Sequence, residues 1–191
     1  METMIRDVYE EIPVLENERF RLREINEETD AADLLKVYSD EKAWPLFNAD
    51  NCWGDFHCTT IEQIQGMISA WQREYEQRYY VRWAVVDKYT REVMGTIELF
   101  NRQAEDYFTD CGLLRLDLRS DYENEECIYS ILNLIVPRSK EFFGCKMIAT
   151  KAVVAAEQRI GVLKQMGFDL SKEVVMGHDG TGFGDYYEKE A

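Results

Sequence analysis

The chain has 191 residues, of which 46% are hydrophobic, and its 37 acidic and 22 basic residues give a formal net charge of −15. This length and composition indicate one globular unit with a substantial core. The acidic balance argues against a nucleic-acid-binding protein, because neutralising phosphates requires clustered Lys and Arg. No run of about 18 uncharged apolar residues is present, so no membrane span is expected.

The cysteines and histidines indicate neither a disulfide framework nor a metal site. The five cysteines have no short paired spacing, and no charged-then-apolar leader opens the chain. The predicted compartment is therefore a reducing cytoplasm. His57 lies between Cys52 and Cys58, but the only other histidine is His178, so no metal ligand set is predicted.

The first elements are an extension, a strand and a helix. Residues 1–18 are acidic and weakly patterned, and we expect them to form an N-terminal extension of a single domain over residues 19–191. Residues 19–25 alternate polar and apolar side chains, which predicts a half-buried strand. A helix should follow, capped by Thr29 or Asp30 and ended by the next Trp-Pro dipeptide.

An aromatic loop, a helix and a hairpin come next. Residues 46–58 lie among turn formers and are typical of a loop that caps the core or walls a cleft; the aromatic residues in and beside it are Trp44, Phe47, Trp53 and Phe56. Thr60 begins a strong helical pattern. Residues 80–86 and 93–100 alternate again and flank a turn, so they predict two paired strands.

The second half alternates strands and helices. Residues 112–118 predict a strand, and a helix starts near Asn124. Pro137 predicts a kink or a break into two short helices, and Gly144 a left-handed helix end.

The last predicted elements are a strand, a helix and a hairpin. Residues 146–154 predict a buried strand, and 155–166 a helix closed by Gly167. The tail, residues 173–190, predicts a hairpin with its turn at 177–184.

Three stretches carry a family resemblance: the opening strand at 18–23, the hairpin strand at 93–98, and residues 159–168, which end in Met-Gly-Phe. Their order and spacing resemble the GNAT N-acetyltransferase superfamily, in particular its ribosomal-protein and antibiotic N-acetyltransferase-like group. The resemblance implies an α/β (α+β) fold with a central mixed, mostly antiparallel sheet of six to seven strands and helices on both faces.

In that family, acetyl-coenzyme A lies between two splayed parallel strands, which the resemblance places here at residues 114–118 and 146–152. Pantetheine would pair with the backbone at Leu116 and Leu118. The pyrophosphate is cradled by a loop of the form Arg/Gln-x-x-Gly-x-Gly/Ala, because close backbone approach to a phosphate tolerates no bulky side chain.

The matching segment here reads Glu-Asn-Glu-Glu-Cys-Ile, so this phosphate loop is degenerate. Glu123 stands at the basic position and Glu126 and Ile128 at the glycine positions; Asn124 and Cys127 complete the candidate cofactor-binding residues. A carboxylate about 4 Å from a phosphate oxygen would cost roughly 4 kcal/mol at an effective dielectric near 20. The same acids also suit a helix N-terminus, where each contributes about 0.3–1 kcal/mol. The cations that could compensate are Arg115, Arg119, Arg138, Lys140 and Arg159.

The resemblance also bears on catalysis. Glu98 and Asp117, at the inner ends of neighbouring strands, are candidate bases for an amine that attacks the thioester, although both could simply face solvent. Where the family carries an Asn and a Ser or Tyr in the late helix, this sequence has Ala156, Arg159 and Leu163.

The function implied by the resemblance is an acetyl-CoA-dependent N-acetyltransferase. Its acceptor would be a primary amine of a small molecule or of a peptide, such as a protein N-terminus. One alternative is a catalytically inactive GNAT-like binding or interaction module. Another is a subunit of a homodimer that packs through the aromatic loop.

Overall fold

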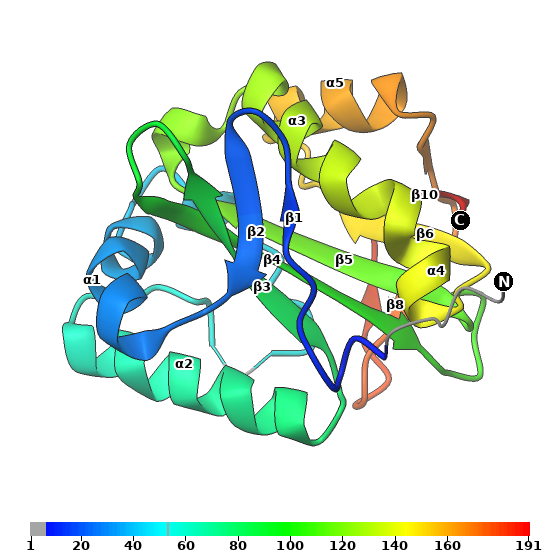
Figure 1. Ribbon diagram of the computed structural model, residues 1–191. Helices are drawn as coiled ribbons and strands as arrows, with labels where there is room; N and C mark the ends of the chain where they lie inside the picture. Colours follow the sequence, from blue (N-terminus) through cyan, green and yellow to red (C-terminus); the bar gives the residue numbers. More distant parts are fainter. Residues whose placement is uncertain (1–6, 53) are drawn as a thin grey trace, which may run out of the picture.

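The computed structural model describes residues 7–52 and 54–191. The strands of its main sheet are β1 Leu15–Glu16, β2 Phe20–Glu24, β3 Val81–Asp87, β4 Val93–Arg102, β5 Cys111–Leu118, β6 Met147–Lys151, β7 Asp169–Leu170 and β10 Tyr186–Glu190. They lie in the order β1-β2-β3-β4-β5-β6-β10-β7 (Figure 1). Only β5 and β6 pair in parallel among the described strands. The predicted fold class is confirmed, and the two-residue edge strands β1 and β7 bring the sheet to eight strands.

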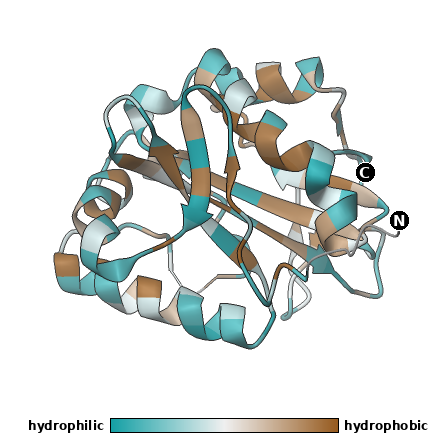
Figure 2. Cartoon of the chain, viewed as in Figure 1, coloured by the Kyte–Doolittle hydropathy of each residue, from teal (hydrophilic) through white to brown (hydrophobic). Residues whose placement is uncertain are grey.

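Helices lie on both faces of this sheet (Figure 1). The α-helices are α1 Glu27–Tyr38, α2 Ile61–Glu76, α3 Glu125–Ile135, α4 Ser139–Phe143 and α5 Glu157–Gln165. Short 3-10 turns lie at η1 Trp44–Leu46, η2 Ser120–Tyr122 and η3 Val136–Arg138. Apolar residues alternate with polar ones along these elements, which gives each helix a face to bury (Figure 2).

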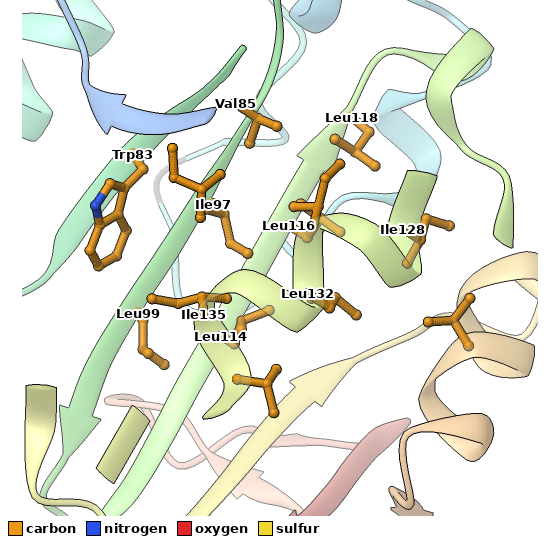
Figure 3. Packing of buried hydrophobic residues seen from close by; sticks show 14 of the residues in the cluster. Trp83, Val85, Ile97, Leu99, Leu114, Leu116, Leu118, Ile128, Leu132 and Ile135 are labelled. Carbon is orange, nitrogen blue, oxygen red and sulfur yellow. The ribbon is translucent and has the colours of Figure 1, made fainter. Parts of the chain in front are cut away.

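The core has one main cluster on each face of the sheet. Leu114, Leu116 and Leu118 of β5 pack against α3, whose Ile128, Leu132 and Ile135 face them (Figure 3). On the other face, residues of α1 and α2 pack on β3 and β4. Because side chains alternate along a strand, Arg115 and Asp117 point to this second face.

Local signals account for the helix ends. Helix α1 is capped by Asn26, the residue before its first turn, whose side chain accepts hydrogen bonds from the N–H groups of residues 28 and 29. The predicted cap at Thr29 or Asp30 was therefore wrong, because an earlier Asx residue already caps the helix. Helix α2 starts directly after Thr60, as the sequence predicts, and the structure shows that Thr60 caps it in a capping box. The break at Pro137 and the left-handed Gly144, with φ of 64°, are also confirmed.

The C-terminal segment differs from the predicted hairpin. The short strands β8 Val175–Met176 and β9 Gly182–Phe183 do pair with each other. The long strand β10, however, leaves this hairpin and inserts between β6 and β7. Strand pairing distant in sequence carries no local signal, so the pattern of residues 173–190 could not reveal it.

The described part of the N-terminal extension packs on the domain. Val8 is buried, and the hydroxyl of Tyr75 donates a hydrogen bond to its carbonyl oxygen. The indole N–H of Trp83 donates to the carbonyl oxygen of Pro13. Trp53 of the aromatic loop lies outside the described residues, whereas Phe47 is buried.

A partly buried ion pair between β2 and α1 gives a first testable prediction. Arg23 makes two hydrogen bonds, of 2.7 and 2.8 Å, to the carboxylate of Asp30. Burial raises the pKa of Asp30, but the hydrogen bonds and charge of Arg23, together with hydrogen bonds from Asn26 and Thr29, outweigh it, so this pKa lies below its ordinary 3.8. Replacing Arg23 with Met should cost about 2 kcal/mol at neutral pH, because the carboxylate loses its cation but Arg23 is partly exposed.

Urea unfolding at a series of pH values checks this prediction. A carboxyl with a lowered folded-state pKa contributes stability above its unfolded pKa, and this contribution is lost as the pH falls through the folded value. The difference between wild type and Arg23→Met should therefore shrink below pH 3.8. Lys36→Met, which breaks an exposed pair with Asp33, is the control and should change little. A pH-independent difference would contradict the assignment.

Candidate active site

Strands β5 and β6 separate part of the way along. Their parallel pairing runs from Cys111 opposite Met147 to Leu114 opposite Thr150. β5 continues to Leu118, so the edge of residues 115–118 that faces β6 is not paired with it. α3 begins a few residues later. An unpaired strand edge beside a helix N-terminus offers backbone donors and acceptors to a ligand.

Arg159 of α5 reaches this free edge. Its Nη1 donates a hydrogen bond of 2.7 Å to the carbonyl oxygen of Leu116. Its Nε and Nη2 donate to the two carboxylate oxygens of Glu123 at 2.6 and 2.9 Å. The two side chains are only 5% and 9% exposed. The candidate residues Leu116 and Glu123 are therefore joined by a residue of the late helix.

The remaining loop residues are arranged around the N-terminus of α3. The Asn124 side chain accepts from the N–H of Cys127 at 3.0 Å, and the Asn124 carbonyl accepts from the N–H of Ile128. The side chains of Cys127 and Ile128 are buried in the core, as is that of Leu118. Glu126 is 85% exposed. Two of the backbone donors expected to face a ligand are thus already used inside the protein.

The opposite face of β5 carries a buried charged cluster built around Arg82. Arg82 and Glu98 stand opposite each other on β3 and β4, and Glu98 stands opposite Arg115 on β5. Arg82 donates to Glu98 Oε2 from Nε at 3.1 Å and from Nη2 at 2.5 Å. Its Nη1 lies 3.2 Å from Asp117 Oδ2, which also accepts from the Tyr38 hydroxyl at 2.9 Å.

The two candidate bases differ in their surroundings. Glu98 lies between two guanidinium groups, with Arg115 Nη1 3.6 Å from its Oε1. Burial raises the pKa of the Asp117 carboxyl; its Oδ1, like Glu98 Oε1, has no hydrogen-bond partner among the described residues. Burial alone would lower the pKa of Arg82, but Glu98 and the other acidic partners raise it well above its ordinary value. Glu98 is therefore a salt-bridge partner, and Asp117 is the better proton acceptor.

A pocket of about 540 Å³ opens on the Asp117 face of the sheet. Leu113 and Arg115, which flank the last paired residue of β5, line it together with Asp50 and Tyr186. Lys151 Nζ contacts the Asp50 carboxylate at 2.7 and 2.9 Å, and the Tyr186 hydroxyl donates to it at 3.1 Å. The pocket thus borders the point at which β5 and β6 separate.

The sequence brought Glu98 and Asp117 into one site but missed their partners. Tyr38 was assigned to a helix face, and Arg82 only to one side of an alternating strand. A charged residue flanked on both sides by apolar or aromatic residues of the same strand is the signal that could have identified Arg82. Arg159 was named among five compensating cations; Arg119 instead pairs with Asp121, and Arg115 lies on the other face.

No metal or membrane feature accompanies this site. Among residues 7–52 and 54–191, no group of three or more His, Cys, Asp or Glu side chains could hold a metal ion. All five cysteines are free thiols. Every helix of the described chain is too short or too polar to span a bilayer.

The comparisons with known proteins settle the family. A family model described as an acetyltransferase (GNAT) domain matches residues 19–169. The chain belongs to the GNAT acetyltransferase family. An uncharacterised N-acetyltransferase of Bacillus subtilis (strain 168), YoaA, is 28% identical to this GNAT protein over 85 residues. That match covers 44% of each chain, so it spans less than half of the relative's length.

Solved structures share the same fold. A ribosomal-protein-S5-alanine acetyltransferase from Vibrio fischeri aligns with a TM-score of 0.67 and 16% identity, over 94% of this GNAT chain and 96% of its own. A ribosomal L7/L12 alpha-N-protein acetyltransferase in complex with coenzyme A aligns with a TM-score of 0.65 and 14% identity, over 93% and 98%. A microcin C7 self-immunity acetyltransferase in complex with acetyl-CoA and AMP gives 0.66 and 14%, over 92% and 94%. The TM-scores establish a common fold, and at these low identities they show the fold alone.

Proposed function

We propose that this GNAT protein transfers an acetyl group from acetyl-CoA to a primary amine of a small molecule or of a protein N-terminus. The observation that carries the proposal is the free edge of β5 beyond Leu114, between the core under α3 and the pocket on the opposite face. The amides of pantetheine can pair with such an edge as an added strand. Family neighbours solved with coenzyme A or acetyl-CoA support the choice of co-substrate.

The residues fit the pantetheine part of acetyl-CoA better than its pyrophosphate. The backbone of residues 115–118 suits pantetheine, because this edge is not paired with β6. The N-terminus of α3 suits a pyrophosphate less well, since the carboxylates of residues 123, 125 and 126 surround it. Acetyl-CoA supplies an activated thioester when bound; the protein must supply a base for the amine.

Asp117 is the proposed base. It points to the face of β5 on which the pocket opens; Arg115, two residues before it, lines that pocket, whereas Asp117 itself is buried behind it. Its raised pKa makes the carboxylate a better proton acceptor than an ordinary Asp. The unpartnered Oδ1 would take the proton that the amine must lose before it attacks the thioester carbonyl.

Asp117→Asn should lower kcat about 100-fold, because the amide keeps the shape of the side chain but accepts no proton at neutral pH. Thiol release from acetyl-CoA, followed across a panel of primary amines, measures this effect. The wild-type rate should rise with pH through the Asp117 pKa, above the ordinary 3.8, and the variant should lose this rise. Asp33→Asn is the control, because Asp33 does not line the pocket and makes no contact with the Arg82 cluster that the structure records. A variant with the wild-type pH profile would exclude Asp117 as the base.

The contact between Arg159 and Leu116 favours a second candidate function, a GNAT-like module that binds a partner without acetyl transfer. In that case no amine would cause thiol release, and acetyl-CoA would not bind to the protein. A cytoplasmic location, assembly as a homodimer and the separate status of residues 1–18 stay predictions.

A further inference from the structure

The ion pair between Arg159 and Glu123 has an unusual position for a structural salt bridge. It connects α5 to the loop before α3 across the free edge of β5. Both side chains are almost fully buried, and the guanidinium makes three hydrogen bonds, two to the carboxylate and one to the backbone. At the place where β5 and β6 separate, the free edge of β5 is therefore occupied by the Arg159 side chain.

Each residue of the pair lies where a bound acyl-CoA would make a contact. The carbonyl of Leu116 is in the unpaired part of β5, and it already accepts a hydrogen bond from Arg159. The Glu123 carboxylate is an anion directly before α3, where a phosphate would be attracted. While the pair is intact, the Leu116 carbonyl cannot accept from pantetheine, and the Glu123 carboxylate stands at the position of a phosphate.

We propose that the Arg159–Glu123 ion pair occupies the acyl-CoA site along the free edge of β5 and that an acyl-CoA binds by displacing it. This inference rests on the proposed function, because it assumes that the free β5 edge is the acyl-CoA site. Glu123 then lowers the affinity for acyl-CoA by holding Arg159 in the site. Weakening the ion pair should strengthen acyl-CoA binding even though a buried interaction is lost.

Calorimetric titration of acetyl-CoA into wild type, Glu123→Gln and Glu126→Gln tests the proposal. The two variants remove the same charge near the start of α3, but only Glu123 bonds to Arg159, whereas Glu126 is 85% exposed. Glu123→Gln should bind about tenfold more tightly than wild type, and Glu126→Gln less than about twofold more tightly. The double variant Glu123→Gln/Arg159→Gln removes both buried charges and should also bind more tightly, which keeps the test valid if the single variant does not fold.

The outcomes separate the two hypotheses. Equal gains in Glu123→Gln and Glu126→Gln would show a general charge effect and overturn the displacement proposal alone. Wild-type binding that neither Glu123 variant improves would do the same, and the proposed use of acetyl-CoA would stand. If no folded variant binds acetyl-CoA, both the displacement proposal and the proposed use of acetyl-CoA are overturned. The site would then not hold the co-substrate even without its ion pair.

Discussion

Replacing Arg82 with Met should destabilise the protein by about 3–5 kcal/mol, a large fraction of the stability of a typical domain. Arg82 is 3% exposed and lies within hydrogen-bond distance of Glu98 and Asp117, which are 1% and 2% exposed. Methionine fills a similar volume but leaves two buried acids with Arg115 as the remaining neighbouring cation. Urea unfolding followed by circular dichroism measures the loss.

A compensating variant shows whether charge causes this loss. Adding Glu98→Gln and Asp117→Asn to Arg82→Met removes the uncompensated acids and should recover a large part of the stability. The matched control is Arg21→Met, because Arg21 pairs with Glu16 on the surface and its loss should be too small to resolve. If Arg82→Met unfolds at the same urea concentration as wild type, the cluster does not hold the two acids as charged partners.

Gly95→Ala should cost about 3 kcal/mol, because β4 and β5 approach too closely at this point for any side chain. A Cβ on Gly95 would lie 2.1 Å from the carbonyl oxygen of Asp117 and 2.8 Å from Leu118 Cδ2. The two strands would have to move apart beside the free edge of β5. The variant should therefore lose acetyl-CoA binding together with stability, which thermal unfolding with and without the ligand would detect.

Gly66→Ala is the control for this substitution. Gly66 lies in the middle of α2, and a Cβ there would meet no atom within 4 Å. Alanine should stabilise that helix by about 0.5–1 kcal/mol, since glycine loses more backbone entropy on folding. The change in the free energy of unfolding should therefore have opposite signs at the two glycines. If Gly95→Ala leaves this free energy unchanged, β4 and β5 can move apart at less cost than their close approach indicates.

The fold was predictable where the signals are local. Alternation located β2, β3, β4 and β5, and the helical spacing of apolar residues that begins at Thr60 located α2. The position of β10 was not predictable, because its partners β6 and β7 are distant in sequence. The cap of α1 was misplaced because Asn26, Thr29 and Asp30 are all good cap residues, and tertiary contact with Arg23 decides that Asp30 is buried.

The sequence supplied two acids as candidate site residues but not their partners. Glu98 and Asp117 followed from the order of the strands, whereas their neighbours depend on register. Arg82 stands opposite Glu98 only in the observed pairing of β3 and β4, and a slip of one residue would move it to the other face. The contact of Arg159 with Glu123 depends in the same way on how α5 packs beside α3.

The internal position of β10 also limits how the protein can be made. β6 and β7 do not pair with each other; each pairs with β10, which lies between them. During synthesis, the first six strands of the sheet can assemble as they emerge, but β7 has no partner until residues 186–190 have left the ribosome. Until then β6 presents an open edge to neighbouring nascent chains. We expect the yield of native protein to depend on how quickly translation finishes, a dependence that chaperones which cover strand edges would reduce.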